Sequence, residues 1–225
     1  MKKFGIGLVV LVLLAVVGYG FGLFGSTEDP ADSSGVVPSF VDETSFAWVL
    51  NPDSKSSMTL EVWEDPQCVY CGDFEKAFSA TINEMVASDT VKVAIRPTSF
   101  LDSNIPGENS ARAINAWACA VDAGIGKQYH DAMYANQPVE GKGWTNADLV
   151  AVAKTAGLMS EKESGFTDCV NSGEFGKWST QSTQVFFDLA IPGTPHVSVN
   201  GDEITVDILK SGDPAAFKAW VFSHA

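Results

Sequence analysis

The chain has 225 residues, of which 45% are apolar and 11% aromatic. This length and composition are typical of a globular protein with a sizeable core and exclude a largely disordered chain. There are 28 acidic side chains against 14 basic ones, which give a formal net charge of −14. Nucleic-acid binding requires a basic surface, so we expect no nucleic-acid partner.

The N-terminal segment predicts a membrane anchor. Lys2 and Lys3 precede an uncharged, mostly apolar run over residues 4–24, which as a helix covers roughly the 30 Å core of a bilayer. The lysines predict a cytoplasmic N-terminus and an extracytoplasmic remainder. A cleaved signal peptide is the alternative, but the run is long for one and lacks an Ala-x-Ala site. We expect a single-pass signal anchor and, over residues 25–44, a small, polar, flexible linker.

Four cysteines in an exported chain predict two disulfides. Three pairings are open, and the simplest combines the local pair Cys68 and Cys71 with the distant pair Cys119 and Cys169. The distant pair could be a second redox pair, but neither residue lies in a CxxC motif and Cys119 falls in an apolar segment. We therefore expect a structural disulfide, which in the chain-entropy model stabilises the fold by about 4 kcal/mol.

Hydrophobic periodicity predicts a strand–helix–strand unit around the CxxC motif. Residues 58–63 alternate as in a strand, and residues 91–96 alternate in the same way. Between them an apolar stripe at spacings of four, four and three predicts an amphipathic helix. The stripe is formed by Phe74, Phe78, Ile82 and Met85. The CxxC motif therefore lies between the end of the first strand and the start of the helix.

The rest of the chain predicts a helical segment over about 103–190 and then a hairpin and a last helix. Thr145–Asp148 and Ser160–Glu163 resemble helix-capping signals. Strands over 197–199 and 204–206 flank a turn at Asn200-Gly201 or Gly201-Asp202, and the register is left open. A final helix begins at Asp213-Pro214. The expected fold is α/β, a mixed four-stranded sheet with a helical insertion.

The position of Cys68 and Cys71 suits reversible disulfide chemistry. A sulfur at a helix N-terminus is favoured as a thiolate, because unpaired backbone N–H groups and the helix dipole stabilise an anion there. The second cysteine lies one turn later and can resolve a mixed disulfide. We therefore expect Cys68 to be the nucleophile and Cys71 the buried resolving thiol. Half of a zinc site and a purely structural disulfide are alternatives, but no second CxxC or Cys–His pair supports zinc.

Three motifs resemble the DsbA family of thioredoxin-fold proteins, and more narrowly its membrane-anchored bacterial members. They are Trp63–Cys71, Gln128–Gln137 and Ile191–Gly201, and they occur in family order within a resemblance that covers about 45–225. The resemblance implies a thioredoxin fold interrupted by a helical domain. It also implies that Pro195 is cis and that Thr194 offers backbone groups to an extended substrate peptide.

The motifs depart from the family pattern in two places. Val69-Tyr70 replaces the Pro-His dipeptide of strong oxidases and carries no cation, so we expect a reduction potential below the value of about −120 mV of strongly oxidising DsbA. Many relatives have a buried acid where this chain has Val62. Glu64 is a candidate proton shuttle, but we expect a solvated carboxylate at a strand end. His196 is a hypothetical source of the missing positive charge, and we expect His130 to be packed or solvated.

The resemblance implies an extracytoplasmic thiol–disulfide oxidoreductase that forms disulfides in exported, unfolded proteins with cysteine thiols. It implies no metal or organic cofactor and a membrane partner, DsbB-like or VKOR-like, that reoxidises the cysteine pair. We expect a monomer, because the sequence has no long dimerisation segment of the kind found in dimeric isomerases of this fold. The alternatives are a disulfide reductase or isomerase, and a non-catalytic peptide-binding or chaperone module.

Overall fold

The computed structural model describes residues 35–42 and 44–224. The predicted anchor over residues 4–24 and most of the predicted linker over 25–44 lie outside these residues. Within the described part of the chain, no helix is both long and apolar enough to cross a membrane.

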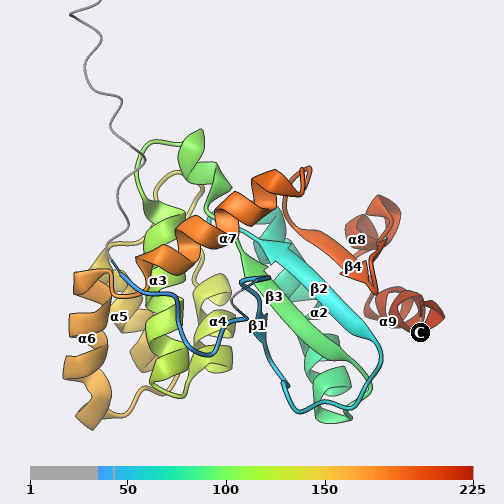
Figure 1. The fold of residues 1–225 in the computed structure, drawn as a ribbon, viewed down its shortest axis with the longest axis horizontal. Coiled ribbons are helices and arrows are strands. Elements are labelled where there is room, and N and C mark those ends of the chain that lie inside the picture. The colour runs from blue at the N-terminus through green and yellow to red at the C-terminus, as the bar shows by residue number, and fades with distance from the viewer. Residues whose placement is uncertain (1–34, 43, 225) are drawn as a thin grey trace, which may run out of the picture. The chain divides into compact units, whose positions relative to one another are not determined.

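Five strands form one mixed sheet in the order β1-β3-β2-β4-β5 (Figure 1). The strands are β1 (Trp48–Val49), β2 (Thr59–Glu64), β3 (Lys92–Pro97), β4 (His196–Val199) and β5 (Asp202–Glu203). β2 and β3 are parallel, and the other neighbouring pairs are antiparallel. The prediction of four strands was wrong because β1, at two residues, is too short to show an alternating pattern.

Helices cover both faces of this sheet. They are α2 (Val69–Ala87), η1 (Phe100–Ser103), α3 (Asn109–Asp122), α4 (Gly126–Ala135), α5 (Asn146–Thr155), η2 (Ser160–Lys162), α6 (Glu163–Ser172), α7 (Gly176–Asp188), α8 (Val206–Ser211) and α9 (Pro214–Ser223). In Figure 1, α2 lies behind the sheet and α7 crosses in front. Phe78 of α2 stacks on Phe217 of α9 with ring centroids 4.6 Å apart. On the other face, Phe186 of α7 meets Trp63 of β2 at 5.6 Å.

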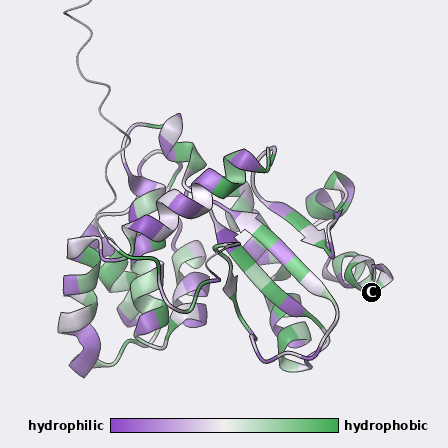
Figure 2. Ribbon diagram, in the orientation of Figure 1, coloured by the Kyte–Doolittle hydropathy of each residue, from purple (hydrophilic) through white to green (hydrophobic). Residues whose placement is uncertain are grey.

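The core lies between the sheet and these helices. Hydrophobic residues run along the middle of β3, next to the central strand β2 (Figure 2). Leu60, Val62 and Val93 are buried almost completely, in agreement with the predicted alternation of β2. Burying such side chains contributes about 1.5 to 3 kcal/mol each, so the strand that leads to the CxxC motif is held firmly in place.

The C-terminal hairpin turns at Asn200-Gly201, because Val199 pairs with Asp202. Both turn residues have positive φ values, 52° and 92°, as a two-residue type I′ turn requires. The strand predicted over 204–206 is wrong. The chain leaves the sheet after Glu203, and α8 begins at Val206.

The segment between β3 and β4 is helical from η1 to α7. The capping box at α5 is present, because Thr145 Oγ1 accepts from Asp148 N at 3.2 Å and the Asp148 carboxylate accepts from Thr145 N at 2.9 Å. The cap expected over Ser160–Glu163 is wrong, because these residues form the 3₁₀ turn η2 and begin α6 without a side-chain cap. Asp213 caps α9, accepting from Ala215 N at 2.9 Å.

The described N-terminal residues pack on the helical segment. Val36 N donates to Glu174 O at 2.8 Å, and Phe40 meets the edge of Trp178 with ring centroids 6.0 Å apart. Val41 is only 5% exposed and belongs to the core. The composition of the chain predicts that the folded domain begins at residue 45. It begins earlier, because Phe40 and Val41 bury apolar surface against the rest of the domain.

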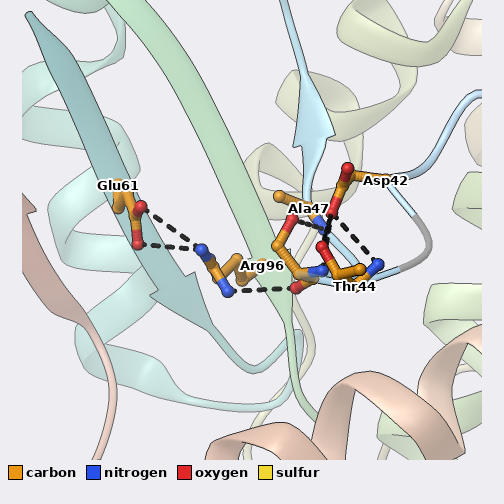
Figure 3. Close-up of polar contacts among 6 residues, drawn as sticks. Asp42, Thr44, Ala47, Glu61 and Arg96 are labelled. Carbon is orange, nitrogen blue, oxygen red and sulfur yellow. Dashed lines mark hydrogen bonds and ion pairs between the residues drawn. The ribbon is translucent and has the colours of Figure 1, made fainter.

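Arg96 ties the segment that enters the sheet to β2 and β3, as Figure 3 shows. Its Nη1 donates to the carbonyl oxygen of Ser45 at 3.0 Å, and its Nη2 lies 3.2 Å from the carboxylate of Glu61. Asp42 closes the same loop by accepting from the Thr44 hydroxyl and the Ser45 N–H, both at 2.7 Å. These contacts fix the approach to β1, the edge strand that pairs with β3.

Candidate active site

Cys68 and Cys71 lie where β2 gives way to α2. Cys68 is the N-cap of α2 and Cys71 lies in its first turn, so both sulfurs occupy the end of the helix that favours an anion. Both are free thiols. Cys68 retains 5% exposure and Cys71 is fully buried, which leaves Cys68 as the accessible sulfur of the pair.

The two thiols differ strongly in acidity. The pKa of Cys68 is lowered to about 6, and the hydrogen bond from the Cys71 side chain is the largest cause. Thr194 and the backbone N–H groups of Cys71 and Tyr70 lower the pKa further, whereas burial raises it. Burial raises the pKa of Cys71 well above its usual value, and the charges of Cys68 and Glu64 act in the same direction. At neutral pH, Cys68 is therefore mostly thiolate and Cys71 a thiol.

The loop before β4 brings Thr194 and Pro195 to these sulfurs. The Thr194–Pro195 peptide bond is cis, the conformation that the family resemblance implies. Cys68 Sγ lies 3.3 Å from the carbonyl oxygen of Thr194, 126 residues away in the sequence. The cysteine pair and this loop thus form one site, beside which an extended peptide could pair with the Thr194 backbone.

The other candidate residues lie around the pair without adding charge to it. Val69 and Tyr70 are 41% and 68% exposed and give the rim of the site an apolar surface. His196 Nε2 lies 3.8 Å from the carboxylate of Glu203. In the part of the chain that the structure describes, no hydrogen bond or ion pair joins His196 to Cys68. The hypothesis that His196 supplies the missing positive charge therefore has no contact to support it.

Glu64 is buried, and the expectation of a solvated strand-end carboxylate is wrong. It is 1% exposed, and its Oε1 lies 2.5 Å from Nε2 of His130, which is itself completely buried. The other ring nitrogen of His130 lies 3.8 Å from the carboxylate of Glu75 in α2. The carboxylate turns inward because the helical segment places His130 against the end of β2. This acid–imidazole–acid cluster lies behind Cys71.

The charges of Glu64, His130 and Glu75 influence one another's protonation. Burial alone would lower the pKa of His130, but the carboxylates of Glu64 and Glu75 raise it to about 10. Burial raises the pKa of Glu75 to about 7, although the charge of His130 opposes this. At neutral pH, His130 is therefore protonated and Glu75 is poised to gain or lose a proton. The three side chains could together hold a metal ion by distance, but each ring nitrogen of His130 already faces a carboxylate.

A second buried polar network holds the turn before Cys68. Asp65 accepts from the Ser110 hydroxyl at 2.5 Å and from Leu101 N at 3.1 Å. The Gln67 side chain donates to Asp102 at 2.8 Å and to Ser110 at 2.9 Å. Burial raises the pKa of Asp65 to about 7. These bonds fasten the turn to the N-terminus of α3, and sequence reasoning did not find them.

Sequence reasoning also missed Glu75, and it placed His130 outside the site. Glu75 lies four residues after Cys71 and therefore on the same face of α2, a spacing that would have identified it. His130 is 66 residues from Glu64 in the sequence, and no local pattern connects the two.

A pocket of about 560 Å³ opens over this face of α2, lined by residues that include Val69, Gly72, Glu75 and Tyr134.

The remaining two cysteines form a disulfide within the helical segment. Cys119 of α3 and Cys169 of α6 are joined with a Cα–Cα distance of 6.0 Å. Cys119 is buried beside core residues, and the bond crosslinks two helices that pack against each other. The disulfide expected from the spacing is thus present, on elements separate from the CxxC motif.

Comparisons with known proteins agree with this geometry. Serine/threonine-protein kinase PknE of Mycobacterium tuberculosis is 28% identical over 156 residues, and the chain spans only 27% of the length of that relative. The structure of MdbA, a thiol-disulfide oxidoreductase from Actinomyces oris, is similar at a TM-score of 0.70 and 23% identity, covering 87% of this chain and 97% of that one. DsbA from Mycobacterium tuberculosis matches at 0.59 and 25% identity, covering 80% and 99%. A family model described as thioredoxin matches residues 51–221, so the chain belongs to the thioredoxin family and has the predicted thioredoxin fold.

Proposed function

We propose that the chain is a thiol–disulfide oxidoreductase that forms disulfides in exported proteins through Cys68 and Cys71. The observation that carries the proposal is the pairing of a low-pKa thiol at a helix N-terminus with a buried, high-pKa thiol beside the Thr194–Pro195 loop. The Cys68 thiolate is a good attacking and leaving group, and Cys71 is held where it can form a disulfide with Cys68.

The reaction proceeds by two exchanges. A substrate thiolate attacks Cys68 Sγ of the oxidised pair, a substrate–Cys68 bond forms, and the Cys68–Cys71 bond breaks. Cys71 leaves as a thiolate and, because its pKa is raised, takes up a proton. A second substrate thiolate then attacks the substrate sulfur, and Cys68 leaves as a stable thiolate. The substrate is oxidised by two electrons and the pair is reduced by two.

The cluster behind Cys71 supports the proton transfer in this scheme. Glu64 raises the pKa of Cys71 by its charge and is linked through His130 to Glu75, which lines the open pocket. We propose that Glu64 exchanges the proton of Cys71 with solvent along this path. The role of Val69 and Tyr70 is to present an apolar rim to the substrate.

Turnover requires an oxidant, which we propose to be a quinone-linked membrane protein of the DsbB-like or VKOR-like type that accepts electrons from the reduced pair. We further propose that residues 4–24 anchor the protein by a single pass, that residues 25–34 continue as a linker, and that the domain lies outside the cytoplasm as a monomer. The disulfide between Cys119 and Cys169 supports an oxidising compartment.

The proposed function is tested by trapping. The variant Cys71→Ser, expressed in cells, should accumulate mixed disulfides between Cys68 and exported proteins, separable on non-reducing gels. The double variant Cys68→Ser/Cys71→Ser is the matched control and should trap none. A peptide-binding or chaperone module would give no mixed disulfide with either variant. Oxidation of a reduced, unfolded substrate that outpaces reduction of insulin would establish an oxidase rather than a reductase.

A further inference from the structure

Gln137, just after α4, reaches from the helical segment to the active-site turn. Its Nε2 donates to the carbonyl oxygen of Pro66 at 2.8 Å and to that of Cys68 at 2.9 Å. These acceptors are 71 and 69 residues away in the sequence. Two carbonyl acceptors at one atom fix the orientation of the amide, because only the NH₂ group can donate to both.

Gly72 leaves room for the other end of this amide. A Cβ atom at position 72 would lie 2.2 Å from Gln137 Oε1, closer than any real contact. Glycine inside a helix is destabilising by roughly 0.5 to 1 kcal/mol relative to alanine. The close approach of Gln137 gives a physical reason for a glycine directly after Cys71 in α2.

The Cys68 carbonyl lies at the centre of the first turn of α2. It accepts from Cys71 N at 3.0 Å and from Gly72 N at 3.2 Å, in addition to Gln137. Because Cys68 is the N-cap of α2, its sulfur lies at the helix end where backbone N–H groups favour an anion, and the N–H groups of Tyr70 and Cys71 contribute to the lowered pKa of Cys68. Anything that fixes this carbonyl therefore also fixes the donors that face the sulfur.

We infer that Gln137 is a positioning residue that holds the first turn of α2 so that its backbone N–H groups face the Cys68 sulfur. The inference deepens the proposed function, in which Cys68 is the nucleophile. It also gives the helical segment a role in the chemistry, since the residue that sets the geometry of the nucleophile comes from the chain just after α4 and not from the strands and helices around the cysteines.

The first test measures the pKa of Cys68 by ultraviolet thiolate absorbance in Gln137→Ala and Gln137→Glu. Both variants lose the donor, so the pKa should rise by about one unit from its value of about 6, a tenfold change in acidity. The matched control is Asn136→Ala, because the side chain of the neighbouring Asn136 donates to Ala132 O at the end of α4 and not to the active-site turn, and it should leave the pKa unchanged. Equilibration with glutathione should show that the reduction potential falls by about 20 mV at about pH 7. This value follows because a tenfold change in the equilibrium constant corresponds to about 30 mV.

The second test is a double-mutant cycle between Gly72→Ala and Gln137→Ala. The new methyl group collides with the Gln137 amide, so Gly72→Ala should raise the pKa of Cys68 in the native background and raise it less when Gln137 is alanine. Unchanged acidity in both Gln137 variants, or additive effects in the cycle, would overturn the inference and leave Gln137 as a structural contact. Neither measurement needs a substrate, so failure of the proposed function would appear only in the trapping experiment.

Discussion

Replacing Cys71 by alanine should raise the pKa of Cys68. The hydrogen bond from the Cys71 side chain is the largest influence that holds this pKa at about 6. A hydrogen bond to a charged group contributes about 1.5 to 3 kcal/mol, and 1.36 kcal/mol corresponds to one pKa unit. Loss of this bond should therefore move the pKa to about 7 or 8. Cys71→Ser keeps a donor at the same place and should stay close to the native value.

The change is measured by thiolate absorbance against pH, with Cys68→Ser as the blank. The reduced protein gives a second measurement, because the pKa of Cys68 in the folded state lies below its ordinary value of 9.0. The stabilisation from this shift is complete above about pH 9 and is lost as the pH falls through about 6. At about pH 7 it amounts to about 1.4 kcal/mol, and at about pH 5 almost nothing remains.

Urea unfolding of the reduced protein should therefore show a loss of about 1.3 kcal/mol between about pH 7 and about pH 5, relative to the same difference in Cys68→Ser. In Cys71→Ala most of this pH-dependent difference should disappear. A pKa of Cys68 that remained at about 6 in Cys71→Ala would refute the reasoning. The helix N–H groups alone would then account for the acidity.

Three further predictions follow from the same structure. The reduction potential should be about −190 mV. DsbA, with a cysteine pKa of about 3.5, has a potential of about −120 mV, and a pKa of about 6 for Cys68 stabilises the thiolate less. A potential of about −120 mV or higher on equilibration with glutathione would contradict this. His130→Ala leaves the carboxylate of Glu64 buried without its partner, so the free energy of unfolding should fall by about 3 to 5 kcal/mol in urea titrations; a loss below about 1 kcal/mol would mean that water replaces the imidazole. Removing the disulfide by Cys119→Ala with Cys169→Ala opens a loop whose ends are 50 residues apart and should cost about 4 kcal/mol in the same assay, with little effect on the pKa of Cys68.

The parts of the site that could be predicted from sequence are those set by local rules. The strand over residues 59–64 and the helix that follows the first cysteine come from periodicity, and their junction places Cys68 at a helix N-terminus. The existence of the C-terminal hairpin came from residue type alone, but only the pairing of Val199 with Asp202 places its turn at Asn200-Gly201. The Thr194–Pro195 loop required the family resemblance, because Gly-Thr-Pro before a strand is otherwise an ordinary turn.

The parts that could not be predicted depend on contacts between distant segments. Glu64 has the local pattern of an exposed strand end, and only the packing of α4 brings His130 to within 2.5 Å of it. Val62, at the position where many relatives have a buried acid, is simply a core residue at 2% exposure. In this chain a buried acid, Glu64, lies two residues later and is held by the imidazole of His130. No local sequence pattern predicts that Glu64 is buried, because its burial depends on how the helices pack.

The helical segment is better understood as a support for the active site than as an insertion that the thioredoxin fold tolerates. It contacts the chain just before and at the first cysteine in three independent places. Ser110 binds Asp65, His130 binds Glu64, and Gln137 binds the Cys68 carbonyl, over separations of 45, 66 and 69 residues. Each contact satisfies a buried polar group that would cost about 1 to 3 kcal/mol if it lost its partner, and about 3 to 5 kcal/mol for the carboxylate of Glu64. The turn therefore cannot shift without breaking bonds to the helical segment, and the acidity of Cys68 is coupled to the packing of these helices.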